Sequence, residues 1–181
     1  MKKASLYFAA AGVILAASWL LYFFLFHNPL FQWLFYIGWA ILAIGLILIF
    51  LPMFVLRSKS RVAVNKSFIH TRNIVKSGIY SVVRHPLYLG WLLMYVAVIF
   101  FSQHWLVMIP SAAGIVFMYL ICRNEDRDMI AKFGRAYENY MKSVPSINIF
   151  SGIIRLLCRS IVKYTKNAED SWKTRCKQLK Y

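Results

Sequence analysis

The sequence predicts an all-α membrane protein: a multi-pass bundle of four transmembrane helices with a cytoplasmic loop and amphipathic C-terminal helices. Composition, apolar runs and the distribution of charge lead to this prediction. Of the 181 residues, 60% are hydrophobic and 15% are charged, and the mean hydropathy is +0.56. A soluble domain is usually about 45–50% apolar and about 25% charged. The composition therefore argues against a soluble enzyme, a disordered chain and a disulfide-rich secreted module, and the length suits one compact membrane domain.

Four apolar runs define the expected spans. They cover residues 5–26, 31–56, 86–101 and 105–122, and contain 22, 26, 16 and 18 residues. Spanning takes about 20 residues, with about 17 as a lower limit. The first two runs therefore cross a membrane comfortably, and the last two are expected to form a tight hairpin. The first run is longer than the core of a cleaved signal peptide, which is about 7–15 residues, so we expect a retained helix.

Charged residues set the expected orientation. The connections 27–30 and 102–104 carry no charged side chain, whereas residues 57–85 carry seven basic residues and no acidic one. Because cytoplasmic segments are rich in Lys and Arg, both termini are predicted to be cytoplasmic. The net charge of +16 is accordingly assigned to contact with the anionic bilayer and not with nucleic acid. A bacterial inner membrane and the endoplasmic reticulum are not distinguished.

Small residues within the spans indicate helix contacts. Gly12 and Ala16 form a small-xxx-small pair in the first span, and Gly38 and Gly45 provide smooth patches in the second. Small side chains let helix backbones approach closely within a membrane. All four positions are therefore expected at helix–helix interfaces.

Two further helices are expected after the fourth span. Residues 125–141 can form one helix with an aromatic face, and residues 151–164 combine an apolar stripe with basic residues every fourth position. The second pattern is typical of a helix lying on a membrane surface. Residues 165–181 are polar and are expected to fray. The chain thus divides into a transmembrane domain, 1–150, and a basic surface helix with a polar tail, 151–181.

Two polar clusters flank the expected hairpin. Residues 84–90, Arg-His-Pro-Leu-Tyr-Leu-Gly, enter the third span, and Glu125-Asp126 follow the fourth. A proline in the first turn of a helix is common, and Arg84 and His85 also suit an anchor at headgroup level. Adjacent carboxylates beside a bilayer, however, suggest a partner: Arg84, His85, Arg123 or a bound ligand. Since both ends of a hairpin return to one face, we expect the two clusters to meet there.

Together the two clusters resemble the integral membrane methyltransferases, the superfamily of isoprenylcysteine carboxyl methyltransferases and phospholipid N-methyltransferases. The resemblance covers about residues 70–147. It rests on the Arg-His-Pro-x-Tyr-x-Gly motif at 84–90, the acidic pair, Phe133-Gly134 and the Tyr-x-x-Tyr at 137–140. It implies an enzyme that uses S-adenosylmethionine as methyl donor in a cytoplasmic pocket of domain 1–150. The implied acceptor is membrane-embedded or lipidic, such as a prenylated small molecule, and the reaction is most like isoprenylcysteine carboxyl O-methylation.

The resemblance also implies roles for individual residues. The implied donor-binding residues are His85, Tyr88, Leu89, Gly90, Glu125 and Asp126. The implied catalytic residues are Arg84, His85 and Glu125, with Arg84 near the donor carboxylate or the substrate. The residue types suit this chemistry, because acids can hold an ammonium group or ribose hydroxyls and Arg or His can hold a carboxylate. The family usually has two Glu in the acidic pair, and Asp126 shortens the reach of the second by one methylene.

Three alternatives remain at this point. Phospholipid or amine N-methylation would need a base, because an amine acceptor must lose its proton, whereas a carboxylate acceptor needs none. A sterol reductase of the related fold is disfavoured because those proteins are much longer and carry an acid where Trp91 follows Gly90. A non-enzymatic four-helix assembly protein would not explain both clusters. No metal is expected, because the three cysteines show no metal-ligand spacing.

Overall fold

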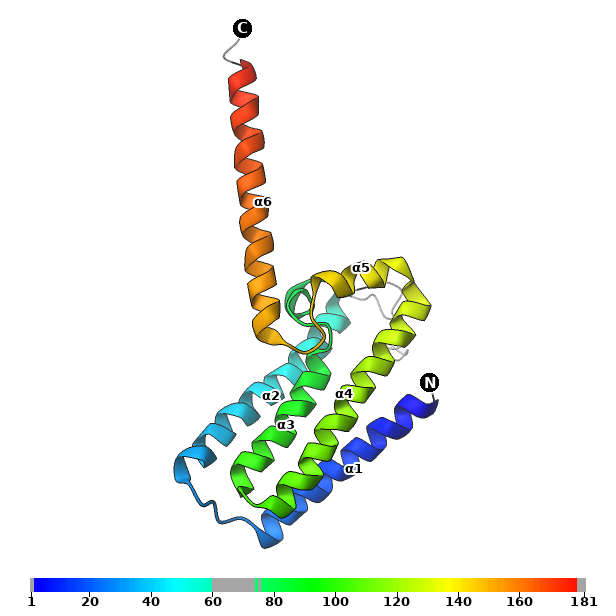
Figure 1. The fold of residues 1–181 in the computed structure, drawn as a ribbon, viewed down its shortest axis with the longest axis vertical. Coiled ribbons are helices and arrows are strands. Elements are labelled where there is room, and N and C mark those ends of the chain that lie inside the picture. Colours follow the sequence, from blue (N-terminus) through cyan, green and yellow to red (C-terminus); the bar gives the residue numbers. More distant parts are fainter. Residues whose placement is uncertain (1, 60–73, 75, 179–181) are drawn as a thin grey trace.

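The computed structural model describes residues 2–59, 74 and 76–178. All regular elements in these ranges are helical (Figure 1), which confirms the all-α prediction. In chain order they are α1 (Lys2–Leu25), α2 (Gln32–Lys59), the short 3-10 helix η2 (Gly78–Ser81), α3 (Pro86–Ser102), α4 (Trp105–Phe133), α5 (Arg135–Ser143) and α6 (Ile149–Gln178). Most of the loop 57–85 expected at the cytoplasmic face lies outside the described residues.

The bundle is formed by α1 to α4, and α3 lies between its neighbours. α3 packs against α2 and α4, and α1 packs chiefly against α4. Helices α1, α2 and α4 are long and apolar enough to cross a membrane, whereas α3 is apolar but has only 17 residues. A helix of this length rises about 25 Å, against about 30 Å of hydrocarbon. The protein is therefore a multi-pass helical membrane protein with one short central helix.

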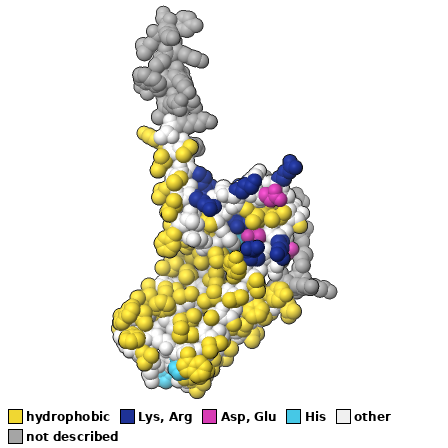
Figure 2. Space-filling view, viewed as in Figure 1, with side chains coloured by type: hydrophobic (Ala, Val, Ile, Leu, Met, Phe, Trp, Pro, Cys, Tyr) yellow, Lys and Arg dark blue, Asp and Glu magenta, His cyan; other side chains and the backbone are white. Residues whose placement is uncertain are grey.

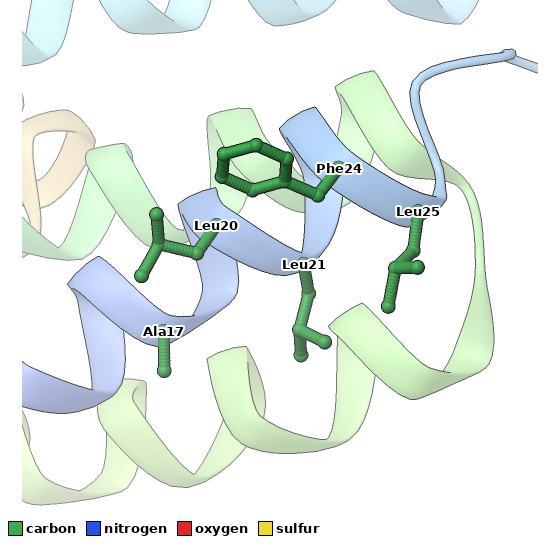
Figure 3. Close-up of a pocket in the computed structure, with 5 residues that line it drawn as sticks. All are labelled: Ala17, Leu20, Leu21, Phe24 and Leu25. Carbon is green, nitrogen blue, oxygen red and sulfur yellow. The ribbon is translucent and has the colours of Figure 1, made fainter.

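Charge and apolar surface are segregated along the bundle. Figure 2 shows the Lys, Arg, Asp and Glu side chains gathered around α5 and the first turns of α6, whereas the opposite end is hydrophobic and carries histidine. A shallow apolar hollow also lies on α1, toward its C-terminal end (Figure 3). It is lined by Ala17, Leu20, Leu21, Phe24 and Leu25. Since all five side chains are apolar, this hollow suits lipid chains and offers no group for catalysis.

The turn between α3 and α4 is held by Gln103. This residue adopts a left-handed backbone conformation with φ 52°. Its side-chain amide donates from Nε2 to the carbonyl of Phe31 at 2.9 Å and accepts at Oε1 from the Phe31 N–H at 2.7 Å. These two bonds tie the α1–α2 connection to the α3–α4 turn. The α3–α4 turn of the expected hairpin is therefore anchored to the neighbouring connection by a side chain.

Helices α2 and α3 approach each other closely at two glycines. A Cβ at Gly90 would lie 2.7 Å from the carbonyl oxygen of Gly45 and 2.7 Å from Cγ1 of Ile49. Gly45 is thus a helix-contact residue as predicted, and so is Gly38, which packs against the ring of Phe101. Gly12 is different, because a Cβ there would meet nothing within 4 Å. The prediction that Gly12 lies at a close helix–helix contact is therefore wrong.

We expect Gly90→Ala to destabilise the bundle. The added methyl group must displace backbone atoms of α2, and overpacking of this kind costs about 1–3 kcal/mol of unfolding free energy. The measurement is the melting temperature in detergent, with Gly12→Ala as the matched control. Gly12→Ala adds the same methyl group to open space and should leave the melting temperature unchanged or slightly higher. Equal decreases for both variants would contradict the close approach at Gly90.

Two expectations about the C-terminal region are wrong. The single helix expected over 125–141 is divided, because Gly134 has φ 55° and ψ −137°, a conformation that ends α4 and lets α5 turn over the end of the bundle. The turn brings Tyr137, Tyr140 and Val144 into a small apolar core. Residues 165–178, which were expected to fray, are helical as part of α6, and residues 179–181 lie outside the described residues. No proline or glycine follows Gly152 to interrupt that helix. The domain boundary at 150/151 stays a prediction.

Candidate active site

The backbone before α3 fixes the positions of Arg84 and His85. The N–H of Arg84 donates to the carbonyl of Pro145 at 3.0 Å, and the N–H of His85 donates to the carbonyl of Ser146 at 3.1 Å. His85 then caps α3, with Pro86 in the first turn, where a missing N–H costs nothing. The connection after α5 thus holds the motif segment in place. The side chains of Arg84 and His85 both reach Asp126 of α4.

Asp126 lies at the centre of the cluster. Its Oδ1 accepts hydrogen bonds from Nη1 of Arg84 at 2.8 Å, Nε2 of His85 at 2.8 Å and the hydroxyl of Tyr137 at 2.7 Å. Asp126 and His85 are only 6% and 7% exposed. Because a carboxylate only accepts, Nε2 of His85 carries a hydrogen. The prediction that the two sequence clusters meet is confirmed, with Arg84 and His85 as partners of Asp126.

Two tyrosines of α5 complete this arrangement. Tyr137 binds Asp126, and the hydroxyl of Tyr140 donates to the carbonyl of Tyr80 in η2 at 2.6 Å. Burial raises the pKa of Tyr80 to about 12, and burial together with the hydrogen bond to Asp126 raises the pKa of Tyr137. Burial likewise raises the pKa of Tyr140. These phenols therefore stay protonated, and Tyr137 and Tyr140 remain donors over the ordinary pH range.

Tyr137 and Tyr140 were missed as site residues by sequence reasoning. The signal was available, because a Tyr-x-x-Tyr spacing places two phenols on one helical face. The sequence could not show which groups they contact. Tyr80 and Asp126 lie 60 and 11 positions from their tyrosine partners. Both contacts depend on the direction in which Gly134 sends α5.

The remaining predicted site residues fall into two groups. Tyr88 and Glu125 lie beside the cluster: the rings of Tyr88 and His85 are 5.5 Å apart, and Glu125 is half-buried and directly precedes Asp126. Leu89 packs on the apolar core of the bundle, and Gly90 packs against α2. Packing alone accounts for Leu89 and Gly90. The donor-binding roles that the resemblance implies for these residues stay predictions.

Arg84 retains a donor that no other described residue uses. Its Nε is buried and forms no hydrogen bond within the described residues. A buried donor of a charged group without a partner is costly, and a carboxylate is the group that a guanidinium binds best. Glu125 adds an acid that suits an ammonium group or hydroxyls. Arg84 and Glu125 therefore fit a ligand with an amino-acid end, such as S-adenosylmethionine, and the described residues contain no cluster of His, Cys, Asp and Glu that suits a metal ion.

The fold and the cluster define a polytopic membrane protein with a buried ionic site at one end of its helical bundle. The family model described as phospholipid methyltransferase matches residues 33–136, more than half of the sequence, and the chain belongs to this family. The match runs from α2 to the start of α5 and includes Arg84, His85 and Asp126. It confirms the resemblance to the integral membrane methyltransferases.

Two curated relatives carry methyltransferase names. The chain is 30% identical over 131 residues to methanethiol S-methyltransferase of Crocosphaera subtropica, covering 68% of this chain and 48% of that protein. It is 35% identical over 69 residues to methanethiol S-methyltransferase 2 of Bradyrhizobium diazoefficiens, covering 38% and 26%. The chain thus spans about half or less of these relatives. No solved structure matches it.

Proposed function

We propose that this chain is an S-adenosylmethionine-dependent methyltransferase whose donor binds at the charged end of the bundle. The observation that carries the proposal is the buried cluster of Arg84, His85 and Asp126, in which Nε of Arg84 has no hydrogen-bond partner among residues 2–59, 74 and 76–178. Membership of the phospholipid methyltransferase family and the names of two relatives support methyl transfer as the reaction class.

Within this proposal, Arg84 of the cluster and the neighbouring Glu125 bind the donor. Arg84 binds a carboxylate, and Glu125 binds an ammonium group or ribose hydroxyls through charge-assisted hydrogen bonds. Asp126 keeps Arg84 and His85 in place, so that little reorganisation is needed when a ligand enters. When bound, S-adenosylmethionine supplies an activated methyl group on a sulfonium. The contribution of the protein is then mainly orientation and exclusion of water.

Two observations favour different candidate methyl acceptors. The sequence resemblance favours a membrane-embedded or lipidic acceptor, most like an isoprenylcysteine carboxylate, and phospholipid or amine N-methylation is the alternative. The relatives' names favour a small thiol as a second candidate. A carboxylate attacks without losing a proton, whereas a thiol or protonated amine must first give one to a base. Because Nε2 of His85 donates to Asp126, Nδ1 is the atom of His85 that would take this proton.

We expect the purified protein in nanodiscs to bind S-adenosylmethionine and S-adenosylhomocysteine saturably. The measurement is equilibrium binding by calorimetry, with a dinucleotide as the control ligand for the reductase alternative. The same preparation, given labelled donor with a prenylated cysteine, an amine phospholipid and methanethiol in turn, identifies the acceptor class. If the dinucleotide bound saturably and neither S-adenosylmethionine nor S-adenosylhomocysteine bound, the proposed function would be contradicted.

We also propose that the charged end and both termini face the cytoplasm. The support is the gathering of Lys and Arg at this end, since positively charged segments stay inside. Cys158 of α6 is exposed and offers a native reporter. In a Cys176→Ser background, a membrane-impermeant maleimide should label Cys158 in inside-out vesicles and not in intact cells. If Cys158 were labelled only in intact cells, the charged end would face the outside and the proposed orientation would be wrong.

A further inference from the structure

Helix α6 carries an exposed apolar stripe. The side chains of this apolar stripe recur at helical spacing and are between 43% and 81% exposed: Phe150, Ile153, Ile154, Leu157, Ile161 and Tyr164. Figure 2 shows hydrophobic atoms along one side of α6, continuous with the apolar surface of the bundle below it. A contiguous apolar surface of this kind marks an interaction site.

The opposite side of α6 is basic and faces the charged end of the bundle. Nη1 of Arg155 donates to the carbonyl of Lys142 at 3.3 Å, and Nη2 of Arg159 donates to the carbonyl of Ser81 at 3.1 Å. Both arginines remain exposed, so their charge is available to a further partner. The helix therefore combines an apolar side with a cationic side.

The first turn of α6 is fixed against the segment that leads to Arg84. A Cβ at Gly152 would lie 2.1 Å from the carbonyl oxygen of Val82, and Gly152 is buried there. Only glycine allows this approach of the two backbones. The first turn of α6 thus packs against Val82, two residues before the motif at 84–90, while the apolar stripe points away from this contact.

We propose that α6 binds the surface of an anionic bilayer, with the apolar stripe in the interface and Arg155 and Arg159 at the lipid phosphates. Three observations favour a bilayer over a protein partner. The stripe continues the apolar surface of a membrane-spanning bundle, the opposite side of the helix carries cationic side chains that complement anionic lipid, and the helix begins at the end of the bundle where the charges gather. Because its first turn contacts Val82, a bound α6 holds the buried cluster at headgroup depth. This proposal does not depend on the reaction that the cluster performs.

The test compares two neighbouring positions of α6 in the full chain. A bimane label at Leu157→Cys, in a Cys158→Ser, Cys176→Ser background, reports on the apolar stripe, and a label on native Cys158 in the Cys176→Ser background reports on the adjoining side. Quenching by nitroxide-labelled lipid is measured in nanodiscs holding one copy of the protein. We expect quenching at position 157 to exceed that at 158 by about twofold or more, because only the apolar side enters the interface.

Three results would overturn the proposal. Equal and weak quenching at both positions would place α6 in water. A label at 157 that is shielded from water but not quenched by lipid would indicate a protein partner. Quenching at 157 only in discs that hold two copies would indicate a second copy of this chain. Equal melting temperatures of the labelled variants and the parent verify that the fold is intact, as expected for an exposed position.

Charge substitutions test the anionic part of the proposal. Replacing phosphatidylcholine discs with discs that contain phosphatidylglycerol should strengthen quenching at 157, and Arg159→Gln should reduce the bound population by about fivefold, the factor expected for one basic residue near such a surface. The control is Arg135→Gln, which removes the same charge from an exposed position on α5. Equal effects of the two variants, or no dependence on anionic lipid, would contradict a specific role of the basic side.

Discussion

Asp126→Ala is expected to give the largest loss of stability and of activity in this protein. The substitution leaves Arg84 and His85 without their shared acceptor in an environment that is almost fully buried. Removing one partner of a buried ion pair costs about 3–5 kcal/mol. The measurements are the melting temperature and methyl transfer from labelled S-adenosylmethionine, and both should fall sharply.

Asp128→Ala is the matched control for this variant. Asp128 lies on the same helix, two residues further along, and is exposed. Its removal should change stability by no more than about 0.5 kcal/mol. A more conservative variant, Tyr137→Phe, removes one of the three hydrogen bonds to Asp126 and should cost about 1 kcal/mol. If Asp126→Ala melted like Asp128→Ala, Asp126 would not be the centre of the site.

Glu125→Gln is expected to separate donor binding from folding. Glu125 is half-buried beside the cluster, whereas the ion pair with Arg84 and the hydrogen bond from His85 are made by Asp126. Glutamine keeps the shape and removes the charge that would hold a ligand ammonium. Hydrogen bonds to charged groups contribute about 1.5–3 kcal/mol, so the dissociation constant of S-adenosylmethionine should rise about 10- to 100-fold. The melting temperature without ligand should stay close to that of the parent.

Glu138→Gln provides the control for Glu125→Gln. Glu138 is an exposed acid in the first turn of α5, so its neutralisation removes the same charge outside the cluster. Donor affinity should be unchanged in this variant. Equal loss of affinity in both variants would indicate a general effect of net charge, and no loss in either would remove Glu125 from the donor site.

The two predictions assign different functions to neighbouring acids that the sequence could not separate. Both follow the apolar part of α4 directly, as consecutive residues, and were expected in the donor pocket. In the structure three protein donors occupy Oδ1 of Asp126. Positioning of Arg84 and His85 is the role that these contacts support for Asp126. A direct contact of Asp126 with the donor stays a prediction.

Some features of this protein are determined by the sequence itself. The long apolar runs predict the helices of the bundle, and the charge-free connections predict that all charges gather at one end. The motif at 84–90 and the acidic pair predict the location of the ionic site. These are local properties, because run length, composition and residue spacing are read directly along the chain.

Other features depend on the tertiary structure. Helices that are apolar on every side give no periodic signal for the face that is buried by protein. The sequence therefore could not show that α1 packs through Ala11, Leu15 and Ser18 while Gly12 is open, or that Gly90 meets α2. Asp126 binds Arg84, which is 42 positions away in the sequence. Tyr137 can bind Asp126 because the backbone conformation of Gly134 turns α5 over the end of the bundle. Contacts between distant segments follow from how the helices pack together.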